Sequence, residues 1–169
     1  MKEQAFLDIV MPFKDRVFRL AKRLLVSHDE AEDATQELYL KLWKNRNKLR
    51  TYKSVEAFAL TMTKNYCLDR LKSKQADNLK LVHSNYKDAH TNLQKTIELQ
   101  DSVERVHKLI ADLPEQQRMI IQLRDIEQYN YDEIAEILQM KNTAVRVALS
   151  RARKTIREKL IKQHAYGLG

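Results

Sequence analysis

The chain has 169 residues, which is enough for one medium-sized domain or two small ones. It is 43% hydrophobic and 32% charged but contains only two glycines and two prolines, a composition that favours helices over strands. The net charge of +8 indicates either a polyanionic partner or simply a basic, solvated surface.

Cys67 is the single cysteine, which excludes a disulfide framework and a thiolate metal cluster. The five histidines have no ligand-like spacing, so we expect neither a metal nor another cofactor. No apolar run approaches the roughly 20 residues of a membrane span, and the N-terminus lacks the apolar stretch of a signal peptide. We therefore expect a cytoplasmic protein with no direct membrane insertion.

The first part of the chain, up to Lys74, predicts helices. Apolar residues recur at helical spacing in its opening stretch, at Phe6, Ile9, Val10, Phe13, Val17, Leu20, Leu24 and Leu25. Ser27 and Glu30 have the spacing of a capping box, which predicts that a second helix begins there. The pattern from about Ser54 to Lys74 predicts a third helix.

Residues 75–97 are polar with weak periodicity and are typical of a linker. A linker this long is unusual inside one compact domain, so we expect two domains, at residues 1–74 and 98–169. The helical pattern returns in the second domain, where Pro114 suits the first turn of a helix whose apolar face continues to about Ile126.

The stretch Tyr131–Ser150 has the pattern of a helix-turn-helix. Ala135 is small where two helix backbones would approach, Asn130 and Glu133 form a capping box, and Asn142 can cap the second helix. The side chains expected to fill the wedge between the helices are Ile134, Leu138, Met140, Val145 and Leu149. The second helix would then present residues 143–154 to the DNA major groove.

Basic side chains distinguish this unit from an ordinary amphipathic hairpin, which has the same apolar spacing. They are Arg146, Arg151, Arg153, Lys154 and Arg157. Arginine pairs with guanine edges, and lysine holds phosphates. Gln139 stands where such turns usually place glycine, so a left-handed backbone there would cost roughly 1 kcal/mol.

Charge is segregated in the first domain. An acidic helix start, Asp29–Glu37, is followed by a basic stretch that bears Tyr52, Phe58 and Tyr66. Compensation of the helix dipole would by itself explain the acids. Basic residues beside aromatics suit single-stranded DNA, although Tyr66 and Phe58 equally fit a core.

Together these segments resemble the extracytoplasmic-function (ECF) sigma factors of the sigma-70 family. Ala31–Trp43 is similar to the family's region 2.1–2.2, and Phe58–Lys74 to its region 2.3–2.4. Leu113–Arg118, Tyr131–Ala135 and Leu149–Lys154 are similar to region 4. The motifs follow the family's order over nearly the full chain. The resemblance implies an all-α protein, a region 2 helical bundle linked to a region 4 helix-turn-helix, acting in transcription initiation without an enzymatic site.

The family's site residues are carried over by matching position. Docking on the β′ clamp of core RNA polymerase would use Glu32, Asp33, Gln36 and Glu37. Binding of the −10 promoter element would use Asn65 and Arg70 at matching positions, together with their neighbours Lys64 and Tyr66, and a base-capturing loop at about Asn47–Ser54. Binding of the −35 element would use Arg146, Ser150, Arg151, Arg153 and Lys154. Further implied partners are the polymerase β flap and an anti-sigma factor, in this family often tethered to the inner membrane.

Two departures from the family pattern leave the promoter sequence open. Lys141–Ala144 replace the common entry to the recognition helix, and Thr63 and Lys64 replace the residues usually found before Asn65. A stand-alone helix-turn-helix regulator is the alternative function. A nuclease is a further alternative, but its candidate carboxylate pairs lie at helix starts, and no glycine-rich phosphate loop is present.

Overall fold

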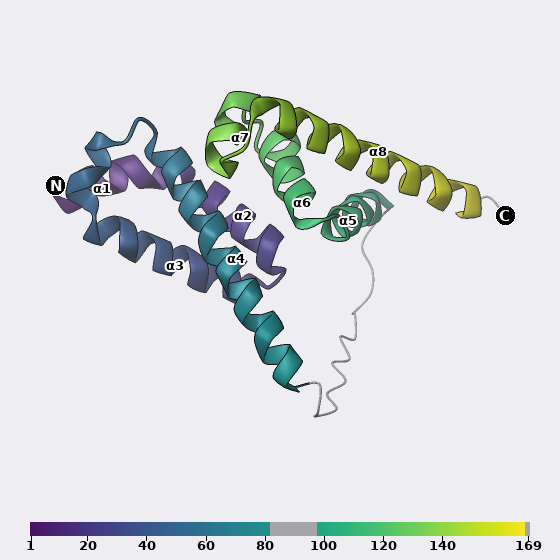
Figure 1. Ribbon diagram of the computed structural model, residues 1–169, viewed down its shortest axis with the longest axis horizontal. Helices are drawn as coiled ribbons and strands as arrows, with labels where there is room; N and C mark the ends of the chain where they lie inside the picture. The colour runs from purple at the N-terminus through teal and green to yellow at the C-terminus, as the bar shows by residue number, and fades with distance from the viewer. Residues whose placement is uncertain (82–97, 168–169) are drawn as a thin grey trace.

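The computed structural model of the chain describes residues 1–81 and 98–167, and every regular element in these ranges is a helix (Figure 1). The all-α prediction is confirmed. In chain order the elements are α1 (Glu3–Val10), η1 (Met11–Phe13), α2 (Lys14–Leu25), α3 (His28–Lys44), η2 (Arg46–Thr51), α4 (Val55–Leu81), α5 (Glu98–Ala111), α6 (Glu115–Ile121), η3 (Gln122–Ile126), α7 (Tyr131–Leu138) and α8 (Asn142–Gly167). Most of the predicted linker, residues 82–97, lies outside the described residues.

The N-terminal half is a bundle of α2, α3 and α4 with α1 across one end. Its side chains in the core, all at most 3% exposed, include Leu20, Leu24, Leu38, Leu42 and Leu60. The first apolar run is not one helix, because Pro12 lies in the short 3₁₀ turn η1 between α1 and α2. Proline has no N–H to donate to a continuous helix, and the chain bends there.

Helix starts in this half follow the sequence pattern. The Ser27 hydroxyl accepts a hydrogen bond from the Glu30 N–H at 3.3 Å and caps α3, as predicted. The Glu30 side chain instead pairs with Lys74 on α4. Helix α4 begins after Ser54, whose hydroxyl accepts from the Ala57 N–H at 3.1 Å, and it extends past the predicted end into the expected linker.

The C-terminal half consists of α5, α6, the single π-helical turn η3, α7 and α8. Pro114 is the residue before α6, one position earlier than predicted. The capping box at α7 is confirmed, since the Asn130 and Glu133 side chains each accept a backbone N–H at 2.8 Å. Gln139 closes α7 in the left-handed conformation, with φ 54° and ψ 46°.

The two halves pack against each other, with α2 on α6 and α4 on α7. Arg19 donates to both carboxylate oxygens of Glu127, at 2.5 and 2.8 Å. The Thr61 hydroxyl donates to the Ile137 carbonyl at 3.0 Å. The molecule is therefore closed, and faces of the two halves cover each other.

Candidate nucleic-acid interface and polymerase-docking surface

The exposed side of α8 is the first candidate surface. Val145, Leu149 and Ala152 are buried on the inner side of this helix, at no more than 2% exposure. Ile134 and Leu138 of α7 complete the predicted wedge, with Met140 partly buried beside them. Since this side of α8 is anchored, its other side faces solvent. The predicted residues exposed there are Arg146, Ser150, Arg151 and Lys154.

Arg146 is held in place before any DNA arrives. Its Nε donates to the Asn142 side-chain oxygen at 2.7 Å, and the Asn142 amide donates to Asp132 at 2.6 Å. The guanidinium also lies 4.6 Å from the centroid of the Tyr131 ring. Asn142 is the first residue of α8. Its side chain orients Arg146, whereas the sequence predicted that it would cap the helix. Such support reduces the entropy lost when an arginine binds a ligand.

Tyr131 is a residue that the sequence reading did not assign to the site. Its ring lies 4.6 Å from the guanidinium of Arg146 and 4.6 Å from that of Arg124. Cation–π contacts of this kind hold an arginine without neutralising its charge. The available signal was an aromatic residue in the first turn of the first helix of a helix-turn-helix.

Arg153 has a different environment from the other basic residues of α8. Its guanidinium donates to both oxygens of Asp125 in η3, at 3.1 and 2.5 Å, and this pairing raises the pKa of Arg153. On a helix it lies about 200° around from Arg151. Its predicted contact with DNA remains a prediction and would compete with the Asp125 pair.

Predicted −10 residues on α4 occupy two sides of the helix. Asn65 is exposed and Tyr66 is half-buried, and both line a hollow of about 230 Å³ together with Lys41 of α3. The Lys41 ammonium lies 5.3 Å from the Tyr66 ring centroid. Arg70 is exposed and lies 4.0 Å from Glu30.

Lys64 differs from these neighbours because it is only 8% exposed. Burial disfavours its charged form and lowers its pKa. It can reach an outside phosphate only if the surroundings of α4 rearrange.

The predicted base-capturing loop is largely the 3₁₀ helix η2 followed by Tyr52, Lys53 and Ser54. The Tyr52 ring stacks on Phe58 with centroids 4.1 Å apart. A hollow of about 380 Å³ lies beside this pair and includes Asn65. Glu136 and Gln139 of the C-terminal half line the same hollow. In the closed molecule, the end of α7 therefore borders this surface.

The acidic side of α3 is the candidate docking surface for polymerase. Glu32, Asp33 and Gln36 are exposed, while Glu37 is partly exposed and lies 3.8 Å from Lys41. Leu40 follows Gln36 by one helical turn and is 54% exposed. The sequence reading missed this apolar residue, although its spacing of four from Gln36 was visible. The surface combines negative charge with one apolar contact.

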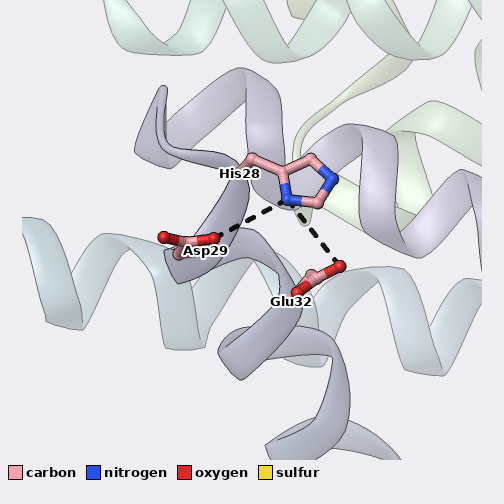
Figure 2. Close-up of side chains that lie close together, drawn as sticks. All are labelled: His28, Asp29 and Glu32. Carbon is pink, nitrogen blue, oxygen red and sulfur yellow. Dashed lines mark ion pairs between the residues drawn. The ribbon is translucent and has the colours of Figure 1, made fainter.

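A histidine and two acids gather at the start of α3 (Figure 2). His28 Nδ1 lies 3.9 Å from an oxygen of Asp29 and 3.7 Å from one of Glu32. The sequence spacing had not pointed to this group. All three are exposed, and the positive end of the helix accounts for the acids. We assign no metal to it.

An apolar groove of about 650 Å³ lies between α5, η3 and α8. Val103, Ile126 and Ile161 contribute to it and are 56%, 37% and 62% exposed. Contiguous exposed apolar surface of this kind usually marks a binding site. The sequence had placed Ile126 only at the end of an apolar helix face.

The fold and these surfaces define a helical DNA-binding protein with a helix-turn-helix in its C-terminal half. Residues 9–76 match the family described as Sigma-70 region 2, and residues 103–156 match Sigma-70, region 4. The chain belongs to the ECF sigma factors of the sigma-70 family.

Full-length relatives agree with this assignment. The ECF RNA polymerase sigma factor SigW of Bacillus subtilis is 25% identical over 169 residues, covering 94% of this chain and 90% of the relative. The RNA polymerase sigma-H factor of Pseudomonas aeruginosa is 27% identical over 165 residues, covering 91% and 85%.

Two solved structures share the fold. The sigma factor RpoE of Bartonella quintana, in complex with the anti-sigma factor NepR, has a TM-score of 0.74 at 21% identity, covering 93% of this chain and 97% of that one. CnrH in complex with the cytosolic domain of CnrY has a TM-score of 0.68 at 17% identity, covering 95% and 90%.

The family sets the general function. The chain is a sigma factor that directs transcription initiation, and sigma factors bind RNA polymerase and promoter DNA without being enzymes. Within residues 1–81 and 98–167, no helix is long and apolar enough to cross a membrane.

Proposed function

We propose that the exposed side of α8 binds the −35 element as duplex DNA. The observation that carries this assignment is the preoriented Arg146, held by Asn142 and Tyr131 beside the exposed Ser150 and Lys154. A helix of this kind enters the major groove, where arginine reads base edges. Arg151 is exposed on one flank of this side, and Arg153 lies on the other flank with Asp125.

The −10 element binds along α4 and the segment that includes η2. Asn65 and Tyr66 line one hollow, and Asn65 also borders the one beside Tyr52. Hollows that combine aromatic and amide side chains suit an unstacked base, which needs both a stacking surface and hydrogen-bonding groups. Arg70 supplies positive charge for the DNA backbone. Lys64 adds its charge when the surroundings of α4 rearrange and expose its side chain.

Core polymerase docks at two places. The acidic side of α3, with Asp33, Gln36 and Glu37, binds the β′ clamp, and Leu40 adds an apolar contact. The apolar groove beside α5 and α8 binds the β flap. An amphipathic segment that lays its apolar face in a groove is a common mode of protein recognition.

Promoter binding requires the closed molecule to open. The −10 and −35 elements are separated by about 25 base pairs, or about 85 Å at about 3.4 Å per base pair. In the closed molecule the Thr61 hydroxyl is only 3.0 Å from the Ile137 carbonyl, and Gln139 borders the hollow that contains Asn65. The two halves therefore separate when polymerase binds.

An anti-sigma factor holds this chain inactive in the cytoplasm. One similar structure is a sigma factor in complex with an anti-sigma factor, and the other is CnrH in complex with the cytosolic domain of CnrY, which supports control by a bound partner here. The apolar groove and the acidic side of α3 are the surfaces that such an inhibitor would cover.

Binding to core polymerase and to DNA tests these assignments together. The chain should co-purify with core polymerase and bind promoter duplex strongly only in its presence. A chain that binds duplex DNA alone with high sequence specificity, and that does not associate with core, would instead be a stand-alone regulator.

A further inference from the structure

A basic pocket of about 440 Å³ lies between α2 and α5, on the boundary between the two halves. Lys22 and Arg23 line it from α2, and His107 and Lys108 line it from α5. None of the described residues that line this pocket is acidic. Like charges are thus brought together from two helices far apart in the chain, an arrangement that costs free energy unless an anion neutralises it.

Arg23 lines the pocket and has neutral hydrogen-bond partners. Its Nε donates to the Gln122 side-chain oxygen at 2.9 Å, and its Nη2 donates to His107 Nδ1 at 2.8 Å. Among the described residues, no carboxylate lies within ion-pair distance of Arg23. Burial and the nearby Arg118 lower the pKa of Arg23, which indicates that its charge is incompletely compensated.

Lys22 and Lys108 are exposed and likewise have no carboxylate partner among the described residues. The acid next to the pocket, Glu127, is already occupied, because it binds Arg19 at 2.5 Å and accepts from the Gln122 amide at 3.2 Å. These contacts leave three cations facing one cavity.

His107 adds a hydrogen-bond donor. Since its Nδ1 accepts from Arg23, the ring proton of the neutral form is on Nε2. Desolvation and the charges of Arg23 and Lys22 lower the pKa of His107, which favours the neutral ring.

We propose that this pocket binds a small phosphorylated ligand whose phosphoryl group is held by Lys22, Arg23 and Lys108. Arginine and lysine donors are the usual protein partners of phosphate. The pocket volume falls in the range for small ligands, and Val26, Ala111 and Ile126 give it an apolar wall for the body of such a molecule.

The ligand stabilises the closed molecule, because the residues that hold it come from both halves. It would thereby oppose polymerase binding, a consequence that rests on the proposed separation of the halves. A ligand that binds only one of two states shifts the equilibrium towards that state.

Calorimetric titration of the full chain with inorganic pyrophosphate, at constant ionic strength, tests the site without polymerase. We expect saturable binding at one site. The double variant Lys22→Gln/Lys108→Gln should bind at least tenfold more weakly, while Lys14→Gln, an exposed lysine elsewhere on α2, should bind as the unaltered chain does.

Three results would overturn the proposal. The first is a titration in which pyrophosphate gives no more heat than added sodium chloride. The second is an affinity for pyrophosphate in the double variant equal to that of the unaltered chain. The third is binding of a single-stranded oligonucleotide that is tighter than binding of pyrophosphate and depends on Lys22 and Lys108, because the pocket would then be part of the DNA-binding surface. Failure of the promoter assignments would leave the pyrophosphate titration unaffected.

Control of closure is tested separately with fluorescent donor and acceptor groups on α3 and α8. Pyrophosphate should weaken binding of the labelled chain to core polymerase at least threefold and favour the short distance. The double variant should not respond. Equal responses of both proteins would contradict the regulatory role.

Discussion

At the scale of single residues, Arg146 and Arg151 differ in how firmly neighbouring side chains hold their guanidinium groups. Arg146 is fixed by Asn142 and Tyr131, whereas Arg151 is exposed on the flank of α8. We expect Arg146→Ala to remove about 1–3 kcal/mol of discrimination at one base pair of the −35 element, because an oriented guanidinium reads a base edge. Transcription from templates substituted at each −35 position measures this.

Arg151→Ala is the comparison for Arg146. If Arg151 binds a phosphate, its loss should weaken transcription uniformly across −35 sequences and reduce the salt dependence of binding. A uniform loss on Arg146→Ala would show that Arg146 also contacts the backbone and would refute its assignment to a base.

Gln139 carries backbone strain at the turn of the helix-turn-helix. With φ 54° it has the left-handed conformation that glycine adopts without steric cost. Gln139→Gly should therefore raise stability by up to about 1 kcal/mol in thermal unfolding of the full chain. The control Glu136→Gly, inside α7, should lower it by about 1 kcal/mol. Equal destabilisation by both changes would be inconsistent with strain at Gln139.

We expect closure of the molecule to depend on pH through the hydrogen bond between Arg23 and His107. The pKa of His107 is lowered from the ordinary 6.5 in the folded chain, so the neutral ring is favoured there. The hydrogen bond from Arg23 to neutral His107 stabilises the closed molecule, and this stabilisation is complete above about pH 6.5. It is lost as the pH falls and the ring becomes protonated, because a protonated ring cannot accept from Arg23. The other charged groups that line cavities with His107 are Arg19, Lys22, Lys108, Asp125, Arg153, Arg157 and His164.

The distance between labels on α3 and α8 should accordingly increase between pH 7.5 and pH 5.5. His107→Gln should make this distance less dependent on pH, since a glutamine can still accept from Arg23 but does not titrate. An unchanged pH response in His107→Gln would assign the opening to other groups. Native Cys67 will not interfere with thiol labelling near neutral pH, because burial raises its pKa to about 12.

Local residue roles could be predicted, but roles that depend on distant neighbours could not. The capping box of Asn130 and Glu133 spans three residues, so the sequence contains all of it. Asn142 orients Arg146 instead of capping because it is already the first residue of α8 and its side-chain oxygen accepts from Arg146, while its amide donates to Asp132, ten residues earlier. Arg153 pairs with Asp125 across a helix packing that no short pattern specifies.

At the scale of helices, α3 is the element on which polymerase docking depends. Charge reversal at Asp33 or Glu37 should weaken binding to core polymerase at least tenfold, because these acids face solvent on the proposed docking side. DNA binding by an isolated C-terminal half should not change. Affinity measurements with core polymerase check this, and Glu3→Lys, an exposed acid at the start of α1, is the matched control. Unaltered affinity in the Asp33 and Glu37 variants would remove α3 from the interface.

Helix positions followed from the apolar periodicity better than helix ends did. The break at Pro12 was visible in the sequence, although the apolar spacing continues through it. The end of α4 was not visible, since Lys74 and the polar residues after it are as compatible with an exposed helix as with a linker. Exposed helical turns have no apolar stripe to mark them.

At the scale of the whole molecule, the closed packing is the feature that sequence patterns could not supply. Its polar contacts join residues far apart in the chain, such as Arg19 with Glu127 and Thr61 with Ile137. The order of the motifs was enough to identify the family, but it carries no information on whether the halves touch. The hollow bordered by Asn65 and Gln139 follows only from this packing.

Opening of the molecule should accompany formation of the polymerase complex. The label distance between α3 and α8 should be short in the free chain and increase when core polymerase is added, because docking uses surfaces on both halves. The substitution Glu127→Gln removes the carboxylate that binds Arg19 and should favour the open form even without polymerase. No change of distance on adding core would contradict the proposed separation.

Run-off transcription tests the recognition of promoters at two points most directly. The reaction contains core polymerase, the full chain and genomic fragments. The promoters mapped on these fragments are then substituted separately at the −10 and −35 positions. The account predicts that transcripts depend on the chain and on both elements, and that Arg146→Ala weakens only the dependence on −35. Chain-dependent transcription that is indifferent to the −35 sequence would contradict it, as would tight and specific promoter binding by the chain without core.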